Sequence, residues 1–414
     1  MPILLPEDYS YSLPPMVPVR QHFDHTHIED EKIAGVLRET LSAPAILSHI
    51  RPGMRVAVAV GSRGIANIPE IVIETIRFLK EQGCEPFIVS AMGSHGGGTE
   101  EGQRQVLEGY GITEKTMGVP IVTSVDTICL GTRKGGIPVY FDRAASEADM
   151  VVPIKRIKLH TDFDGPIQSG LCKMLVIGLG NQKGCSQMHE TPPSDFARGL
   201  LDAARLILSK VNVGFGVAVM ENAYDETCHL EAVPSEMLIS REEELAQKCR
   251  SLMPFIRINH ADVLVVDEIG KDISGAGFDP NILGRSCMLY VKRLPVPDFQ
   301  RMVLLGLTEA SHGNAIGIGY FDVVTKNVVD AMDMEQVYAN ALACRSPEDA
   351  RIPVTAKDRE EAIRIALKCC RDVHIDRKGP GILEIRNTAD LDTIWVSPAL
   401  LSQVKEDPAL EILG

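Results

Sequence analysis

The stretch RVAVAVGSRGIANIPEIVIETIRFLKEQGCEPFIVSAMG, residues 55–93, has the pattern of strand, helix and strand. Residues 55–60 form a short apolar run of the kind found in buried strands. Residues 69–83 have a proline in the first turn and a glycine at the end, which is typical of a helix. Residues 86–93 are again apolar. The stretch therefore predicts a helix between two buried strands.

The alternation of strand and helix continues along the chain. Apolar runs at residues 149–158 and 210–219 predict two further strands, and residues 195–210 between them predict an amphipathic helix. Alternation of this kind is typical of helices that connect parallel strands. The sequence therefore predicts an α/β fold with a largely parallel, Rossmann-like sheet.

The length of 414 residues predicts two domains. We expect an N-terminal α/β domain at residues 1–253, which begins with a proline-rich extended arm and carries the cofactor and catalytic residues. A smaller C-terminal α/β domain is expected at residues 254–391, with the site in the cleft between the two. Whether residues 392–414 pack back on the first domain is left open.

The composition excludes several classes of function. Hydrophobic residues make up 45% and charged residues 24%, as in ordinary soluble proteins, and the net charge of −14 argues against nucleic-acid or anionic-membrane surfaces. The N-terminus lacks the features of a signal peptide, and no apolar run approaches the roughly 20 residues that span a bilayer. Ten cysteines without C-x-x-C motifs suggest reduced thiols. We expect a cytoplasmic protein.

Two glycine-rich loops follow predicted strands. GSRGIAN comes after the strand at 55–60, and GSHGGGTEEGQ at 93–103 comes after the next one. Ligands of parallel sheets bind at the carboxyl ends of strands, so the loops would place Arg63 and His95 at one rim. The second loop could bind an anion through its backbone or be a plain turn, and it lacks the Walker pattern.

Two other motifs give weaker signals. VIGLGNQKG at residues 176–184 approximates a G-x-G-x-x-G fingerprint, but its spacing is wrong by one, which favours a tight turn over a pyrophosphate site. HFDHTH at residues 22–27 has three closely spaced histidines. A metal site is conceivable there, but the charged run that follows favours a solvated segment.

Lys173 lies within the apolar stretch GLCKMLVIGLG, residues 170–180. A buried and unpaired lysine costs free energy, and such lysines often have lowered pKa values and act as covalent anchors or phosphate partners. The alternative is a lysine at the edge of a buried strand whose amine extends to solvent. The apolar residues on both sides favour the functional interpretation.

Four motifs together resemble the lactate racemase family, whose members depend on a nickel-pincer nucleotide. The family has a histidine in a glycine loop, a histidine that opens a glycine-rich segment ending in lysine, and another histidine beyond that lysine. SHGGGT supplies His95, HTDFDG supplies His160, SGLCK supplies Lys173 and CSQMH supplies His189. The resemblance is best from about residue 56 to residue 189 and continues more loosely beyond.

The resemblance implies a role for each residue. Lys173 would tether a pyridinium-3-thioamide-5-thiocarboxylic acid mononucleotide through a thioamide. His189 would complete a square-planar Ni(II) site, which suits soft sulfur donors and an imidazole. His95 and His160 would flank the substrate as alternate general bases and acids. Arg63 stands where the family has a guanidinium for the substrate carboxylate.

The implied activity is that of an isomerase, a racemase or epimerase of a 2-hydroxy acid. Carbon two of such a substrate carries no acidic hydrogen, so simple deprotonation is difficult. If the hydroxyl proton is removed while hydride leaves to an electrophilic ring, a planar 2-keto acid forms. Hydride returned to the other face then inverts the configuration. The implied partners are the small-molecule substrate and the cofactor-synthesis proteins that load the chain.

The chain departs from the family mainly around the substrate. In the family's D-x-T-R-P loop, Val60 replaces the aspartate, and Gly96 replaces the arginine that follows the loop histidine. The family's Q-x-x-K pair is missing from the second domain, where residues 267–285 offer Lys271 or Arg285 as the substrate cation. These departures favour a larger or differently substituted 2-hydroxy acid over lactate.

Two alternative functions remain open. The chain could be a homologue that binds a nucleotide or anion without turnover, because Val60 and Gly96 depart from the family pattern. It could also be a nicotinamide-dependent dehydrogenase that uses the glycine turn at 176–184, although Lys173 and His189 would then have no role. His312, in a further glycine-rich stretch, is assigned no role.

Overall fold

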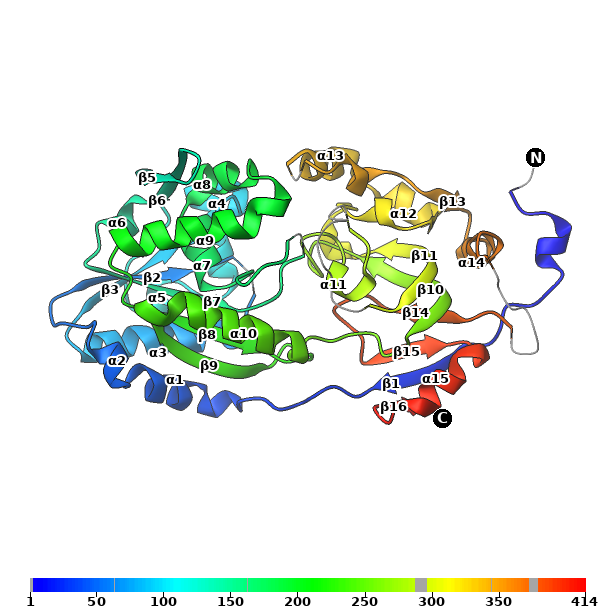
Figure 1. Cartoon of the computed structure of the whole chain (residues 1–414), viewed down its shortest axis with the longest axis horizontal. Coiled ribbons are helices and arrows are strands. Elements are labelled where there is room, and N and C mark those ends of the chain that lie inside the picture. Colours follow the sequence, from blue (N-terminus) through cyan, green and yellow to red (C-terminus); the bar gives the residue numbers. More distant parts are fainter. Residues whose placement is uncertain (1–2, 63, 162, 287–295, 344, 372–378) are drawn as a thin grey trace. The chain divides into compact units, whose positions relative to one another are not determined.

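The computed structural model describes residues 3–62, 64–161, 163–286, 296–343, 345–371 and 379–414 (Figure 1). The chain divides into two compact units, residues 24–253 and residues 1–23 together with 254–414. Each unit contains a largely parallel sheet with helices, so the predicted α/β class is confirmed.

The stretch at 55–93 forms the predicted strand, helix and strand: β2 (Arg55–Val60), α3 (Ile68–Glu81) and β3 (Glu85–Ser90). Val56, Val58 and Val60 lie in one core with the apolar faces of α3 and of α1 (Ile33–Leu41). Because side chains alternate along a strand, the intervening alanines of β2 are buried on the opposite face. The sheet is thus covered on both faces, as its continuous apolar strands require.

Six strands form the sheet of the unit 24–253, in the order β4-β3-β2-β7-β8-β9. The four not yet described are β4 (Ile121–Val122), β7 (Met150–Arg156), β8 (Phe215–Glu221) and β9 (Thr227–Pro234). Every neighbouring pair is parallel except β8 and β9. β2 lies between β3 and β7, so the loops that follow these three strands leave from one edge of the sheet.

The stretch at 170–180, for which a buried strand was one alternative, is helical from residue 171 to residue 178. Leu171–Lys173 form α7, and a π-helix, η4 (Met174–Gly178), continues from it. The side chains of η4 are buried. A short apolar run that is buried on all sides has no periodicity that distinguishes a strand from a helix. The sequence therefore did not identify this helix. π-Helices are rare and often occur at functional sites.

The other elements of this unit complete its two faces. The helices α8 (Asn181–His189), α9 (Pro193–Lys210) and α10 (Leu238–Leu252) follow η4, and α9 confirms the helix predicted at 195–210. The rest are η2 (Asp30–Lys32), α2 (Pro44–Leu47), η3 (Gly96–Gly98), α4 (Glu100–Gly109), α5 (Glu114–Met117), a hairpin of β5 (Thr127–Arg133) and β6 (Ile137–Asp142), α6 (Arg143–Ser146) and η5 (Ser235–Met237).

The second unit contains an eight-stranded sheet in the order β13-β12-β11-β10-β14-β15-β1-β16. The strands are β1 (Val17–Gln21), β10 (His260–Ile269), β11 (Asp298–Leu307), β12 (Val323–Thr325), β13 (Val354–Ala356), β14 (Ile382–Ile385), β15 (Thr393–Val396) and β16 (Leu410–Ile412). The strands from β13 to β14 in this order are parallel, and the pairs β14–β15, β15–β1 and β1–β16 are antiparallel.

Both ends of the chain belong to the second unit. Residues 1–23, which we grouped with the first domain, belong to the second unit, because β1 pairs with β15 and β16. Residues 392–414 also lie in the second unit and supply both of these partner strands. Val19 of β1 is fully buried in that unit's core, so apolar burial holds the arm there.

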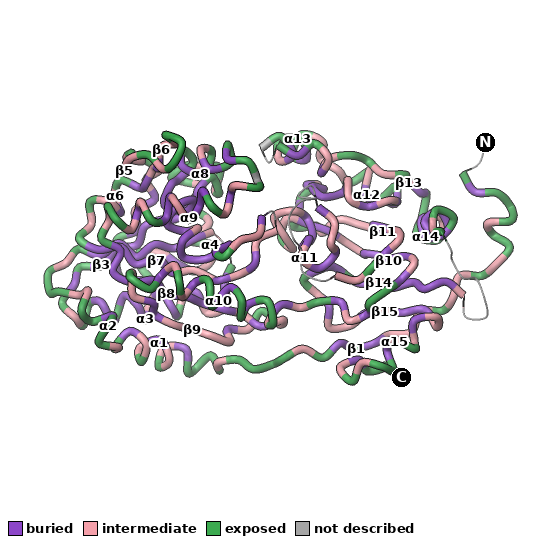
Figure 2. Tube along the Cα trace, in the orientation of Figure 1, coloured by how far each residue is buried: buried purple, intermediate pink, exposed green. Residues whose placement is uncertain are grey.

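Helices cover the second sheet, and its strands are largely buried (Figure 2). These helices are η1 (Pro6–Tyr9), α11 (Pro280–Leu283), η6 (Glu309–Ser311), η7 (Ile318–Tyr320), α12 (Lys326–Ala331), α13 (Met334–Ala343), η8 (Pro347–Ala350), α14 (Arg359–Lys368), η9 (Pro398–Leu400) and α15 (Leu401–Glu406). None of the helices in the described ranges has the length and apolar character needed to cross a bilayer. The cysteines described are free thiols.

Candidate functional site

His160 and Lys173 are in direct contact. The distance from Lys173 Nζ to His160 Nε2 is 2.5 Å. His160 lies in the loop after β7, where its backbone N–H donates to the buried Gln168 side chain at 2.7 Å. Lys173 is the last residue of α7, directly before the π-helix. The first residue comes from a strand-end loop and the second from a buried helix, so the backbone on both sides is held in place.

A row of aromatic rings joins His160 to His189. The His160 ring stacks on Phe163 with centroids 4.2 Å apart, and Phe163 lies 4.7 Å from Phe196. The ring of Phe196 lies 5.6 Å from that of His189. Both phenylalanines are buried, whereas His189 is exposed at the end of α8. Lys173 and two of the predicted histidines thus belong to one connected cluster.

His95 is exposed in the loop after β3, and its Nδ1 lies 2.6 Å from the hydroxyl of Ser62. Ser62 follows β2, so the contact joins the loops of adjacent parallel strands. Gly93 N–H donates to the carbonyl of Gly178, the last residue of the π-helix, at 3.0 Å. The His95 loop therefore packs against the same helical segment that carries Lys173.

The structure explains why the family's arginine is replaced at Gly96. This residue has φ +64°, and a methyl group on it would lie 2.6 Å from backbone atoms of Gly102 and Gln103. Thr99 caps α4 by accepting from Gly102 N–H, which turns the loop back on the helix. The loop conformation thus requires glycine at position 96. Val60, the other departure, is buried in the core of the sheet.

Lys155 is a cation at this edge that we did not predict. It lies near the end of β7, and a methyl group on Gly61 would be 3.4 Å from its Nζ. The same methyl would be 3.5 Å from the Met174 side chain, so the amine lies between the end of β2 and the π-helix. The signal in the sequence was a lysine at the polar end of an otherwise buried strand.

Glu242 is a second residue that the sequence did not indicate. Its side chain on α10 is 1% exposed, and one carboxylate oxygen accepts the backbone N–H of Cys172 at 2.7 Å. The other oxygen has no partner among the described residues. Burial raises the pKa of Glu242 to about 7 and also raises the pKa of the Cys172 thiol. Glu242 therefore supports the short helix that carries Lys173.

The glycine turn at 176–184 joins the π-helix to α8 and follows no strand. A methyl group on Gly180 would lie 2.3 Å from the carbonyl of Val176, so the backbone approaches closely there. Asn181 has φ +51° and donates to the buried Asp142 carboxylate at 2.9 Å. Burial raises the pKa of Asp142 to about 6. A dinucleotide fingerprint requires a preceding strand, so the tight-turn interpretation holds.

The remaining candidates for binding the substrate are Arg63, Lys271 and Arg285. Arg63 lies outside the described residues. Lys271 and Arg285 belong to the second unit, where Lys271 donates to the Gly275 carbonyl at 2.8 Å and Arg285 pairs with Asp322 at 2.7 Å. His312, to which we assigned no role, has φ +48° and ends η6.

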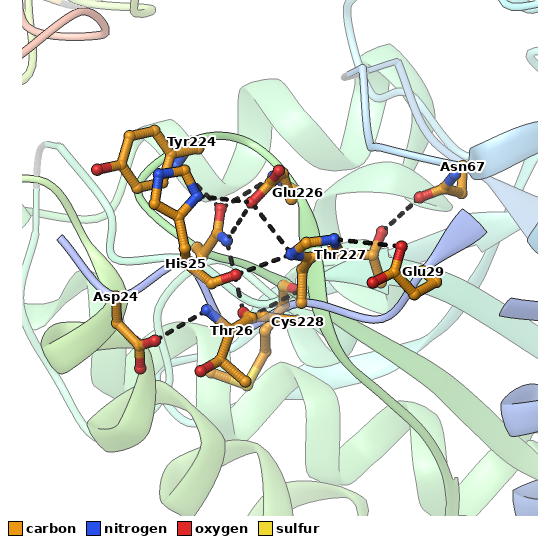
Figure 3. A network of polar contacts seen from close by, with 12 residues as sticks. Asp24, His25, Thr26, Glu29, Asn67, Tyr224, Glu226, Thr227 and Cys228 are labelled. Carbon is orange, nitrogen blue, oxygen red and sulfur yellow. Dashed lines mark hydrogen bonds and ion pairs between the residues drawn. The ribbon is translucent and has the colours of Figure 1, made fainter. Parts of the chain in front are cut away.

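The histidines of the segment 22–27 contact carboxylates. His22 lies 3.0 Å from Glu411, and the rings of His25 and His27 each lie 3.6 Å from Glu226. Figure 3 shows His25 stacked on Tyr224 and facing Glu226. Within the described ranges, no three histidine, cysteine or acidic side chains form a group that could hold a metal ion.

The architecture defines a class of protein. A parallel sheet whose strand-end loops bring imidazoles to one edge, beside a helix that carries an amine, is typical of proteins that bind small molecules at that edge. Residues 13–195 match the model of the lactate racemase N-terminal domain. This part of the chain is therefore a lactate racemase N-terminal domain, as the resemblance of its motifs predicted.

Two solved structures show the same fold. The lactate racemase apoprotein from Thermoanaerobacterium thermosaccharolyticum has a TM-score of 0.53 at 14% identity, over 91% of this chain and 99% of that one. A protein from Thermotoga maritima has a TM-score of 0.52 at 15% identity, over 89% and 99%. No curated protein matches the chain. At these identities the likeness concerns the fold alone.

Proposed function

We propose that the chain is a racemase or epimerase of a 2-hydroxy acid and works with a nickel-pincer nucleotide tethered to Lys173. The observation that carries the proposal is the 2.5 Å contact between Lys173 Nζ and His160 Nε2. It joins the expected anchor to one of the two expected acid/base groups. Both residues lie within the part of the chain that matches the lactate racemase domain.

The chemistry of the residues fits this cofactor. Lys173 offers the primary amine that a thioamide tether needs. His189 is exposed at the end of α8, and its imidazole suits a metal whose other donors, one carbon and two sulfurs, come from the nucleotide. The buried rings of Phe163 and Phe196 lie between His160 and His189 and are apolar. When bound, the group would supply an electrophilic acceptor for the hydride of carbon two.

His95 acts as one acid/base group. Ser62 contacts Nδ1 of its ring, so we assign proton exchange with the substrate hydroxyl to Nε2. The hydroxyl of Ser62 also orients the ring, as the partner of a catalytic histidine commonly does. Because His95 follows β3 and His160 follows β7, the two imidazoles come from strands on opposite sides of β2. This placement suits two bases that serve opposite faces of one carbon.

His160 acts as the other acid/base group, and its ring has little freedom to move. Phe163 holds one face of the imidazole, and Gln168 fixes the backbone. A lysine amine that has been converted to a thioamide carries no positive charge. His160 Nε2 would then exchange its proton with the substrate instead of with the amine of Lys173.

Lys155 is our candidate for binding the substrate carboxylate within this unit. Its amine lies above Gly61 and beside Met174, at the edge of the sheet where the acid/base groups lie. An ammonium group binds a carboxylate as a point charge, without the two-pronged geometry of a guanidinium. Arg63 and Lys271 remain proposed contributors to substrate binding. A substrate larger than lactate, such as a sugar acid, is in keeping with the departures from the family pattern.

The proposal is tested with protein produced together with the cofactor-synthesis proteins. Intact mass should show an adduct that Lys173→Ala removes and that Lys183→Ala, an exposed lysine on α8, retains. A panel of 2-hydroxy acids and sugar acids, followed by chiral chromatography, should reveal a substrate whose carbon two is inverted. His95→Ala should keep the adduct and lower the rate by at least about 100-fold.

The outcomes separate the candidate functions. An adduct without inversion of any acid in the panel would identify a homologue that binds the nucleotide without turnover. No adduct at Lys173 in loaded protein would overturn the proposal. The loss of nickel on treatment with a chelator should abolish inversion and leave the organic part of the adduct on Lys173.

A further inference from the structure

We propose that Arg250, on α10, is a positioning residue for His160. Acting through Asp164 and Gln168, it holds the loop that presents the imidazole. The inference rests on the proposed function, because it concerns one of the two acid/base groups assigned there. It can be tested on the chain without cofactor, so the arrangement of the loop is measured whether or not the chain is a racemase.

The loop that carries His160 is closed at its base. The backbones of Lys158 and Ser169 exchange two hydrogen bonds, of 2.8 Å and 3.1 Å. Beside this bridge, the buried side chain of Gln168 accepts the His160 N–H at 2.7 Å. The ring of Phe163, which is also buried, stacks on the imidazole. The direction of the imidazole therefore depends on Gln168 keeping its place.

Asp164 keeps Gln168 in place. The amide of Gln168 donates to one carboxylate oxygen of Asp164 at 2.9 Å. The same oxygen accepts the N–H of Gly165 at 2.9 Å and Nη2 of Arg250 at 3.1 Å. A carboxylate with three donors at one oxygen cannot turn without breaking all three hydrogen bonds. The bond from Arg250 has a charge on both partners and is the strongest of the three.

The helix α10 supports both sides of the site. Glu242 accepts a backbone N–H of α7, the helix that carries the anchor. Cys249, seven residues later and so on the same face, donates its thiol proton to the carbonyl of Ile157 at 3.5 Å, where the chain enters the loop. Arg250 is the next residue. The contacts of Glu242 and Arg250 are about 12 Å apart along the helix axis, so one helix sets the distance between the anchor and the loop.

The ion pair of Arg250 and Asp164 adds little to the stability of the fold. Their side chains are 42% and 31% exposed, and pairs with this exposure typically contribute about 1 kcal/mol or less. Loss of Arg250 should therefore leave the chain folded. The change should be in the orientation of the imidazole, since Asp164 and then Gln168 gain freedom to turn.

The test uses the full chain with isotope-labelled histidine and NMR spectra of the imidazole C–H groups. The signals of His160 are those that His160→Gln removes. An imidazole stacked on Phe163 lies above an aromatic ring, whose ring current shifts the imidazole proton signals upfield. Arg250→Ala should reduce this upfield shift. Gln168→Ala should reduce it further, because it removes the contact to His160 itself.

Arg241 provides a matched control on the same helix. It pairs with Glu231 and Glu244 and has no contact with the loop among its printed bonds. Arg241→Ala should leave the His160 signals unchanged. Arg250→Lys keeps a cation at the decisive position and should restore most of the upfield shift. Circular dichroism of each variant verifies that it is folded.

A pair of substitutions tests the middle of the chain of contacts. Gln168→Glu keeps an oxygen for the His160 N–H but sets two carboxylates against each other, so it should reduce the upfield shift. Asp164→Asn combined with Gln168→Glu exchanges the amide and the carboxylate, and one hydrogen bond between positions 164 and 168 is possible again. The double variant should therefore lie closer to the wild type than Gln168→Glu alone.

Two results would overturn the inference. One is a folded Arg250→Ala chain with the His160 signals of the wild type. The other is an equal change in Arg241→Ala and Arg250→Ala, which would show that α10 acts through its stability and not through Asp164. If the signals change as expected but Lys173 never carries the nucleotide, the proposed function fails and the positioning role stands.

Discussion

At the scale of single residues, glycines decide the path of the loop that carries His95. Gly96 and Gly97 have nearly the same backbone conformation, with φ of +64° and +66°. A methyl group on Gly96 would meet the backbone of Gly102, whereas one on Gly97 would meet nothing within 4 Å. Substitutions at the two positions therefore distinguish the cost of the backbone conformation from the cost of steric overlap.

This difference predicts the effect of alanine at each position. Gly97→Ala should lower the free energy of unfolding by about 1–2 kcal/mol, the cost of a left-handed conformation for a residue with a Cβ. Gly96→Ala should cost about 1–3 kcal/mol more, because the methyl group overlaps backbone that cannot move away. Urea unfolding measures both values. Equal losses would show that the backbone around Gly102 gives way.

Glu242 predicts a dependence of stability on pH. Burial raises its folded-state pKa from 4.5 to about 7, so the folded chain binds the proton more tightly than the unfolded chain. The stabilisation is complete below pH 4.5 and is lost as the pH rises through 7. Between pH 4.5 and pH 7 the free energy of unfolding should fall by at most about 1.4 kcal/mol per pH unit because of this group.

The variant Glu242→Gln should remove this slope and keep an oxygen that accepts the Cys172 N–H. Urea midpoints at pH 5, 6, 7 and 8 give the measurement. The neighbouring Glu243 is exposed, so Glu243→Gln serves as the control and should follow the wild-type curve. A Glu242→Gln curve parallel to that of the wild type would contradict the assigned cause.

At the scale of elements, β2, α3 and β3 were predictable from the local sequence, because a proline and a glycine mark where the helix begins and ends. The convergence of the loops after β2 and β3 followed from their parallel arrangement. The helix at 171–178 was missed, since burial on all sides removes the periodicity that identifies a helix. Glu242 was missed because its contact with Cys172 arises from packing between elements, which no local pattern encodes. Lys155 was missed because a lysine at the polar end of a buried strand does not by itself indicate a site.

Residues 24–30, which lead into α1, are held by contacts whose strength should depend on pH. His25 and His27 contact Glu226, which directly precedes the strand β9, and Figure 3 shows His25 facing Glu226. The pKa of His27 is raised because its ring contacts the His25 carbonyl and lies near Glu226 and Glu29. A raised folded-state pKa means that protonation holds the segment in place, and that this stabilisation is lost as the pH rises through that value.

Glu226→Gln should therefore loosen residues 24–30. We expect their amide hydrogens to exchange several-fold faster at pH 6, with a smaller difference at pH 8, once rates are corrected for intrinsic exchange. Hydrogen–deuterium exchange with mass spectrometry provides the measurement. Glu411→Gln removes the partner of His22 in the other unit and should leave residues 24–30 unchanged. An effect that is equal at both pH values would exclude protonation as the cause.

At the scale of the whole molecule, the sequence indicated an α/β chain of more than one unit but grouped residues 1–23 with the wrong unit. Val19 pairs with Ile394 and with Ile412, partners that lie almost the full chain away. The proline-rich sequence around β1 predicted an extended arm. An extended arm and a strand inside a sheet have the same backbone conformation. Only the partner strands distinguish the two, and local composition does not specify them.

The position of β1 between β15 and β16 has a consequence for biosynthesis. Translation produces residues 17–21 long before both of the strands with which they form hydrogen bonds. The unit 24–253 can complete its own sheet in the meantime. For that whole interval both edges of β1 lack their partner strands, and Pro18 within it has no N–H that could bond to another strand.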